Sequence, residues 1–194
     1  SEGQAMFEST LERDFLTLLA FDPNVISFEV QPVQIVWSDL HGKSHYYTPD
    51  VIASFAKPEK TILYEVKYRS ELREHWNLLR PKFKAAHHFA RSRDWHFKLI
   101  TDAEIKTPYL ENVKFLLPIT RQIHPTAISQ EKLLLHLHRL HMSTPAILVD
   151  QLSESKWVQA ELLSTLWYLI GVKQIGCDLQ QKITMNSTIW SIQP

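Results

Sequence analysis

The stretch "YTPDVIASFAKPEKTILYEVKY", residues 47–68, decides how this chain folds, because it is typical of two strands joined by a tight turn. Its apolar runs are rich in β-branched and aromatic residues, and the segment "AKPE" at 56–59 has the Pro and the charges of a hairpin loop. With that loop, Phe55 lies opposite Lys60, and the same register continues away from the turn. The register therefore predicts that Asp50 lies directly across from Glu65.

Two carboxylates in this arrangement need a counter-charge. Side chains directly opposite each other in an antiparallel pair have Cβ atoms about 4.5–5.5 Å apart, and like charges there destabilise a sheet. Lys67 lies on the same face as Glu65 because side chains alternate along a strand, but one lysine neutralises only one acid. The alternative is an exposed strand face with an incidental salt bridge, which is common for so short a pattern.

A divalent cation would balance both acids. Mg²⁺ keeps several waters and commonly binds through one or two carboxylates together with a substrate phosphate. The pattern therefore predicts a Mg²⁺ site, in which Mn²⁺ can substitute, held by Asp50 and Glu65, with the carbonyl of Val66 as an extra ligand. Lys67 would orient the attacking water or stabilise charge on the phosphoryl group.

The flanking segments predict an α/β domain over residues 1–117. Helices are expected over "FESTLERDFLTLLAFDP" (7–23) and "SELREHWNLLRPKFKAAHHFARSRD" (70–94), and strands over "VISFEVQPVQIVW" (25–37), "HYYTPDVIASF", "TILYEVKY" and "WHFKLIT" (95–101). Pro81 is expected to kink the second helix or to start a new one. The apolar stripe of that helix is predicted to contain Leu72, Trp76, Leu79, Phe83, Ala86 and Ala90. Thr101 and Glu104 have the spacing of a capping box. Helices and strands in this order favour a mixed sheet covered by helices.

Residues 118–194 are expected to form a separate small domain. Pro118 and "RQIHPTAIS" have the composition of a linker. Three short helical segments then precede "KQIGCDLQQKITMNSTIWSI", which is typical of a hairpin. Three helices followed by a hairpin predict a winged helix-turn-helix.

The charges are unevenly distributed although the formal net charge is +0. Residues 1–56 contain two Lys or Arg against eight Asp or Glu, whereas residues 60–98 contain ten against four. An acidic section followed by a basic one suits a site that binds metal ions and then phosphates, although two solvated faces of opposite charge would give the same counts. The cations predicted to follow a DNA backbone are Arg69, Arg73, Arg80, Lys82, Lys84 and Arg91.

Composition also limits the class of protein. A single cysteine, Cys177, excludes an intrachain disulfide and a cysteine-based zinc cluster, and it favours a reducing cytoplasm. The longest nearly apolar run, "ELLSTLWYLIGV" (161–172), is too short to span a bilayer, so no membrane association is expected. Glu12 lies at the edge of the apolar stripe of the first helix, where spacing alone does not distinguish a metal ligand from a solvated acid.

The pattern of Asp50 after "YTP", followed by "YEVKY", resembles the PD-(D/E)xK core shared by restriction enzymes and related nucleases. A wider set of blocks, "ESTLERDFLTLLAFDPNVISFEVQP", "YTPDVIASF", "YEVKYRSELREHW", "PKFKAA" and "TDAEIKTPYLENVKFLL", is similar to TnsA, the endonuclease subunit of heteromeric cut-and-paste transposases. The resemblance implies a restriction-endonuclease-like core. It also implies a catalytic set of Glu12, Asp50 and Lys67, with Glu65 completing an all-carboxylate metal site and Gln31 supporting it from behind.

The resemblance further implies a function. Family members cut the 5′ ends of a mobile element by Mg²⁺-dependent hydrolysis, while a separate DDE-type transposase subunit acts on the 3′ ends. Their C-terminal domain contacts an AAA+ ATPase regulator, which makes residues 118–194 a partner-binding module by analogy. The expected function is therefore cleavage of transposon-end DNA within a multiprotein complex. Two alternatives remain open: a Holliday-junction or repair nuclease on the same core, and a non-catalytic adaptor that grips DNA.

Overall fold

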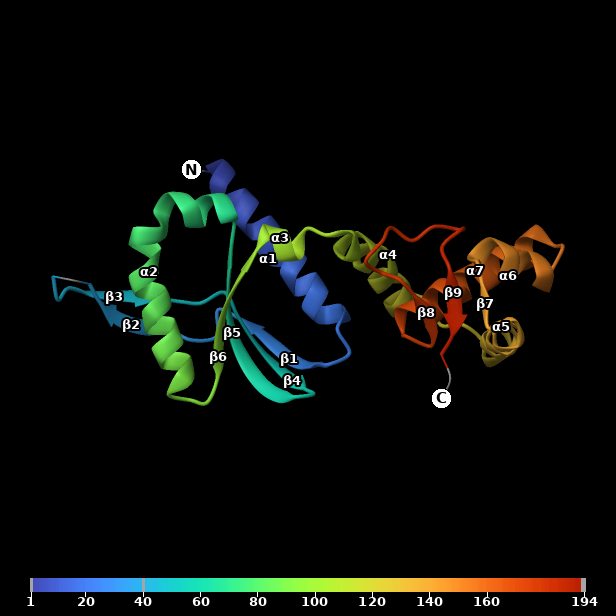
Figure 1. Ribbon diagram of the computed structural model, residues 1–194, viewed down its shortest axis with the longest axis horizontal. Helices are drawn as coiled ribbons and strands as arrows, with labels where there is room; N and C mark the ends of the chain where they lie inside the picture. The colour runs from blue at the N-terminus through green and yellow to red at the C-terminus, as the bar shows by residue number, and fades with distance from the viewer. Residues whose placement is uncertain (1, 40, 193–194) are drawn as a thin grey trace. The chain divides into compact units, whose positions relative to one another are not determined.

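The computed structural model describes the backbone of residues 2–39 and 41–192, with side chains from Thr10 onward. The chain divides into two compact units, Ser1–Lys106 and Thr107–Pro194. Figure 1 shows the elements of both units. The elements of the first unit are α1 (Glu2–Phe21), β1 (Val25–Val30), β2 (Ile35–Ser38), β3 (Ser44–Tyr47), β4 (Val51–Ala56), β5 (Glu59–Lys67), α2 (Arg69–Arg91), β6 (His96–Thr101) and α3 (Asp102–Ile105).

The first unit is built on a mixed sheet. Within the described residues, four strands pair in the order β1-β4-β5-β6, with β4 antiparallel to both β1 and β5 and with β6 parallel to β5. A separate ribbon pairs β2 with β3. The prediction of a mixed α/β core is therefore confirmed.

The hairpin has the predicted register. Phe55 pairs with Lys60, and the ladder continues to Val51 and Tyr64. Ala56 and Glu59 also pair, so the loop is only the two residues Lys57 and Pro58 rather than the whole of 56–59. Pro58 needs no ladder hydrogen bond at this place, which is why the turn accepts it.

Helices α1 and α2 cover opposite faces of the sheet. Phe15 of α1 packs edge-on against Tyr64 of β5, with ring centroids 4.9 Å apart. Leu63, the neighbouring residue on β5, belongs instead to a buried cluster with Ala86 and Ala90 of α2. Because successive side chains on a strand point to opposite faces, Glu65 and Lys67 share the face of Leu63 and lie on the α2 side.

Helix α2 breaks at a different place from the one predicted. The backbone leaves helical geometry at His75 (φ −114°, ψ 17°), whereas Pro81 lies inside the second helical segment. Because of this break the apolar stripe continues only after it: Leu79, Phe83, Ala86 and Ala90 are buried, but Trp76 is 43% exposed. Leu72, before the break, is half-buried.

The end of β6 has the predicted capping box. The backbone N–H of Thr101 donates to the carboxylate of Glu104, and the Thr101 hydroxyl accepts from the N–H of Ala103. These bonds satisfy donors that the first turn of α3 would leave unpaired.

The second unit begins earlier than the predicted boundary at residues 117 and 118. Pro118 is not in a linker but is an exposed residue of α4 (Pro108–Gln122). Helix α4 continues through it because Leu110, Val113 and Leu116 are buried on one face, and this packing outweighs the lost hydrogen bond. Gly171, at the end of α7 (Lys156–Gly171), allows α7 to approach α4 closely, since a Cβ there would meet the side chains of Thr120 and Leu116.

The remaining elements of the second unit alternate helices with short strands. They are α5 (Ala127–Leu140), β7 (Met142–Ser143), α6 (Pro145–Leu152), α7 (Lys156–Gly171), β8 (Ile175–Cys177) and β9 (Ile189–Ser191). The strands pair in the order β7-β9-β8, with both pairs antiparallel. The predicted helical segments and terminal hairpin are therefore present. Asn112 of α4 fixes the loop between β8 and β9 by donating to the carbonyls of Leu179 and Gln181 and accepting from the N–H of Ile183.

None of the helices in the described part of the chain has the length and apolar character needed to cross a bilayer.

Candidate active site

Asp50 and Glu65 meet at the end of the β4–β5 ladder. The paired residues of the ladder stop at Val51 and Tyr64, one residue short of the two acids, and two hydrogen bonds extend the contact. The N–H of Asp50 donates to the carbonyl of Tyr64 at 3.1 Å, and the N–H of Val66 donates to Asp50 Oδ2 at 2.7 Å. Asp50 is therefore held against β5 by both its backbone and its carboxylate.

The pKa of Asp50 is affected by its burial and by the nearby Glu65 carboxylate. Burial, followed by the negative charge of Glu65, raises the pKa of Asp50 to about 7. The Val66 N–H and the Lys67 ammonium act in the opposite direction, and the charge of Glu12 adds to the rise. Ionising both carboxylates in a poorly solvated site costs free energy. A cation bound between them would lower that cost.

Glu65 is the more buried of the two acids, with an exposed fraction of 2%. Its Oε2 accepts a hydrogen bond from the Tyr47 hydroxyl at 2.5 Å, and its Oε1 accepts one from Lys82 Nζ at 3.1 Å. Burial and the neighbouring Glu65 carboxylate raise the pKa of Tyr47, so its hydroxyl stays protonated and remains a donor. Hydrogen bonds of this kind hold a buried carboxylate in a fixed orientation.

Lys67 lies next to the same acid, as strand alternation predicts. Its Nζ is 4.0 Å from Glu65 Oε1 and 3.8 Å from the Glu71 carboxylate at the start of α2. With 11% of its side chain exposed, Lys67 is at the edge of the site rather than in open solvent. The sequence-predicted trio of Asp50, Glu65 and Lys67 is thus brought together.

Glu12 and Val66 both interact with Asp50, Glu12 through its charge and Val66 through its backbone N–H. Glu12 is half-buried on α1, and its charge reaches Asp50. Among the described residues, however, no group of three or more His, Cys, Asp or Glu side chains is spaced to hold a metal ion, so Glu12 does not complete a three-acid cluster in this conformation. Val66 contributes its N–H to Asp50, and the role of its carbonyl as a ligand stays a prediction.

The donor set nevertheless fits a hard divalent cation that keeps most of its waters. Asp50 and Glu65 supply carboxylate oxygens, which are the ligands that Mg²⁺ and Mn²⁺ prefer. Burial and the nearby Glu65 raise the pKa of Asp50, so an added cation would stabilise its charged form. Asp50, Glu65 and water are the donors that would hold such an ion.

Gln31 supports Asp50 through its backbone. Its N–H donates to the Asp50 carbonyl at 2.8 Å, while its side chain is exposed. Gln31 has a φ of 50°, a left-handed conformation that is uncommon for residues other than Gly, Asn and Asp. This hydrogen bond holds the backbone of Asp50 at the point where the chain leaves β1.

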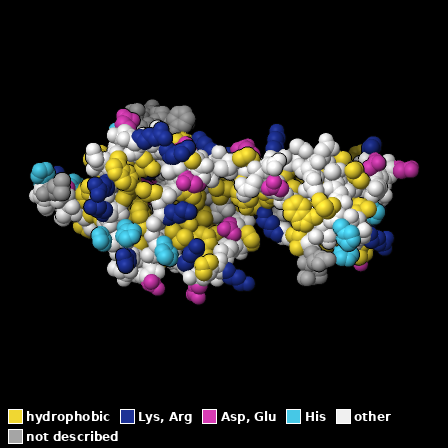
Figure 2. All heavy atoms as spheres, viewed as in Figure 1, with side chains coloured by type: hydrophobic (Ala, Val, Ile, Leu, Met, Phe, Trp, Pro, Cys, Tyr) yellow, Lys and Arg dark blue, Asp and Glu magenta, His cyan; other side chains and the backbone are white. Residues whose placement is uncertain are grey.

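The predicted DNA-binding cations separate into two groups. Five of them are exposed: Arg69, Arg73, Arg80, Lys84 and Arg91. Figure 2 shows Lys, Arg and His side chains gathered along the side of the first unit where α2 runs. Lys82 departs from this prediction. It lies on the buried side of α2, where it contacts Glu65 and the ring of Tyr47, with its Nζ 4.9 Å from the ring centroid.

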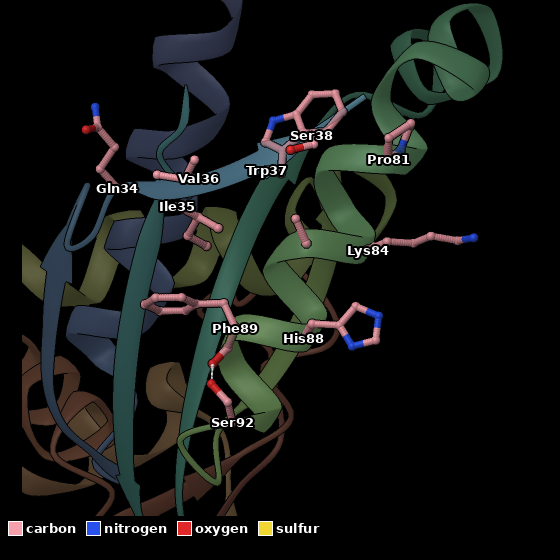
Figure 3. A pocket seen from close by; sticks show the side chains of 11 residues that line it. Gln34, Ile35, Val36, Trp37, Ser38, Pro81, Lys84, His88, Phe89 and Ser92 are labelled. Atoms are coloured by element: carbon pink, nitrogen blue, oxygen red, sulfur yellow. Dashed lines mark hydrogen bonds between the residues drawn. The ribbon is translucent and has the colours of Figure 1, made fainter. Parts of the chain in front are cut away.

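A groove of about 720 Å³ lies between β2 and α2. Figure 3 shows Phe89 pointing toward the sheet, whereas the side chains of Lys84 and His88 point away from it. Trp37, on the other wall, stacks on His45 with centroids 4.8 Å apart. The groove thus has aromatic walls and a cationic outer edge on the same helix that carries Lys82.

Sequence reasoning missed Tyr47, and it assigned Lys82 to the DNA surface instead of to Glu65. Lys82 falls three residues after Leu79 and four before Ala86, both buried, so its helical position is on the covered side of α2. That spacing alone could have predicted that Lys82 faces the sheet. No local pattern identifies Tyr47, because its contact with Glu65 depends on where the β2–β3 ribbon lies.

Comparison with known families supports an endonuclease assignment. Residues 22–102 match the model of the family described as TnsA-like endonuclease N terminal, and this range includes Asp50, Glu65, Lys67 and Lys82. This stretch is a TnsA-like endonuclease N-terminal domain. The resemblance inferred from sequence blocks is thereby confirmed over that range. A comparison with curated proteins gave no match.

Proposed function

We propose that the chain is a metal-dependent DNA endonuclease that cleaves the 5′ ends of a transposon during cut-and-paste transposition. The observation that carries this proposal is the meeting of Asp50, Glu65 and Lys67 inside a TnsA-like endonuclease N-terminal domain. Burial and Glu65 raise the pKa of Asp50, and this supports the proposal because a bound cation would stabilise the two charged acids. Perturbed acids beside a lysine are typical of hydrolytic sites.

In this proposal Asp50 and Glu65 hold Mg²⁺, and Mn²⁺ substitutes for it. A bound divalent ion supplies Lewis-acid polarisation of the phosphodiester and lowers the pKa of a coordinated water. Lys67 donates to the attacking water or to a phosphoryl oxygen as charge develops there. Tyr47 and Lys82 keep Glu65 in place through their hydrogen bonds. Glu12 contributes further negative charge near Asp50.

The exposed cations of α2 would hold the DNA duplex over these acids. Arg73, Arg80, Lys84 and Arg91 are all exposed, and Arg69 lies at the start of the helix, directly after β5. Contacts from such residues go mainly to phosphates and fix the position of the duplex without reading its sequence.

We propose that the second unit contains a winged helix. After α4, its elements run helix, strand, two helices and a two-stranded hairpin, and the first strand pairs with the hairpin, which supports this proposal. We propose that it is the partner-binding module, which joins the nuclease to a DDE transposase subunit and an AAA+ ATPase regulator.

The test is cleavage of labelled transposon-end DNA by the chain with its transposase subunit, in the presence of Mg²⁺ or Mn²⁺. Asp50→Ala and Lys67→Ala should each reduce nicking by about 100-fold or more, because each removes a group that acts on the reacting centre. Glu59→Gln, an exposed carboxyl at the hairpin turn, is the matched control and should cleave normally. Unchanged nicking by both site variants would defeat the assignment, and cleavage of branched DNA by the chain alone would favour a repair nuclease.

A further inference from the structure

Lys82 occupies an unusual place for a lysine on a basic helix. Only 22% of its side chain is exposed, and its Nζ donates to Glu65 Oε1 at 3.1 Å. The ammonium also lies over two aromatic rings, 4.9 Å from the centroid of Tyr47 and 5.2 Å from that of Phe83. These contacts place a positive charge on an oxygen of one of the two paired acids.

The two lysines near Glu65 are not equivalent. Lys82 is within hydrogen-bond distance of Oε1, whereas Lys67 is 4.0 Å from the same atom and also interacts with Glu71. The stronger contact therefore comes from α2 and not from the strand that carries the motif. A lysine held this way compensates the charge of Glu65 directly.

A cation at Oε1 must compete with any divalent ion that uses the same oxygen. Like charges a few ångströms apart repel strongly in a partly buried site. The aromatic faces of Tyr47 and Phe83 give the ammonium a favourable place to remain when it leaves the carboxylate, because cation–π attraction does not need Glu65.

We propose that Lys82 is a positioning residue that stands in for the metal ion at Glu65. It neutralises and orients the carboxylate while the site is without its ion, and it gives up Oε1 when a divalent cation binds. This inference rests on the proposed role of Asp50 and Glu65 as metal ligands. It assigns Lys82 to the metal site instead of to the DNA surface.

The experiment is calorimetric titration of the full chain with Mn²⁺, without DNA. Lys82→Met removes the competing charge while retaining an unbranched apolar side chain, so Mn²⁺ should bind more tightly by about tenfold, which is about 1.4 kcal/mol. Lys82→Arg keeps the charge and should bind Mn²⁺ as the wild type does. Lys98→Met, which removes an exposed lysine from β6 in the same unit, is the matched control and should also leave the affinity unchanged.

A second measurement protects the test against misfolding of the Met variant. Without Mn²⁺, Lys82→Met should melt at a lower temperature than the wild type, because Glu65 loses its nearest positive charge. Saturating Mn²⁺ should then raise its melting temperature by more than it raises that of the wild type.

Equal or weaker Mn²⁺ binding by Lys82→Met, with an equal or smaller thermal shift, would overturn the proposal and leave Lys82 as a structural support of Glu65. Failure of the underlying function has a different signature. In that case the wild type would bind no Mn²⁺, or its binding would not depend on Asp50.

Discussion

Replacing Asp50 by Asn should stabilise the folded protein at alkaline pH even though it removes a proposed metal ligand. The ionised form of Asp50 is disfavoured in the folded state, where its pKa is about 7 against an ordinary value of 3.8. That difference corresponds to on the order of 4 kcal/mol of unfavourable free energy when Asp50 is charged. Asn has the same shape, and its carbonyl oxygen can accept the hydrogen bond from the Val66 N–H.

The pH dependence of stability follows from the number of protons that the folded and unfolded states bind. Because the folded state holds the Asp50 proton more tightly than the unfolded state, the wild type loses stability as the pH rises from about 4 to about 7. Asn does not titrate, so Asp50→Asn should match the wild type closely near pH 4 and exceed it by about 2–4 kcal/mol above pH 8. Partial relaxation of the site accounts for the lower end of that range.

The assay is urea unfolding in the presence of a chelator at a series of pH values, followed by a signal from the first unit. Glu59→Gln removes an exposed carboxyl from the same hairpin and should change the free energy of unfolding by less than about 0.5 kcal/mol. Glu65→Gln removes a charge that Lys82 compensates, so it should lower stability by about 1–3 kcal/mol. The reasoning is refuted if Asp50→Asn is no more stable than the wild type above pH 8, or if its advantage is the same at every pH.

Three further outcomes follow from the contacts described above. Tyr47→Phe removes the hydroxyl that donates to Glu65 Oε2 and should lower the free energy of unfolding by about 1–2 kcal/mol in urea titrations, whereas Tyr46→Phe, an exposed neighbour, should have no effect. Asn112→Leu leaves three backbone groups of residues 179–183 without a partner and should destabilise the second unit by about 2–4 kcal/mol, measured by thermal unfolding of the whole chain; an unchanged transition would contradict the role given to Asn112. Arg80→Ala should reduce the slope of log K against log salt for duplex binding by roughly 0.9, measured by fluorescence anisotropy, if Arg80 contacts a phosphate.

The sequence was sufficient for the hairpin because local rules determine it. Alternation fixes which side chains share a face, and the short loop fixes the register, so the meeting of Asp50 with Glu65 follows from residues 47–68 alone. The capping box at Thr101 is predictable for the same reason, since both partners lie within one turn.

The features that were missed depend on tertiary packing. Lys82 and Tyr47 reach Glu65 from elements whose place over the sheet no local pattern specifies. Pro118 was expected to end a domain, but it lies on the exposed side of a helix that is held by its buried face. The break in α2 occurs at His75, which has no helix-breaking chemistry of its own, so propensity alone pointed to Pro81.

The length of the loop at Lys57 and Pro58 sets the register of β4 and β5, and therefore the pairing of two acids that the loop does not contact. Six residue steps, or about 20 Å of strand, separate the turn from the two acids. One extra residue passed from the loop into either strand would slide the ladder by a single step and turn one acid toward the opposite face of the sheet. The length of this loop therefore matters to the proposed active site as much as the two acids do, because an insertion that shifts one strand would separate Asp50 from Glu65 without changing either residue.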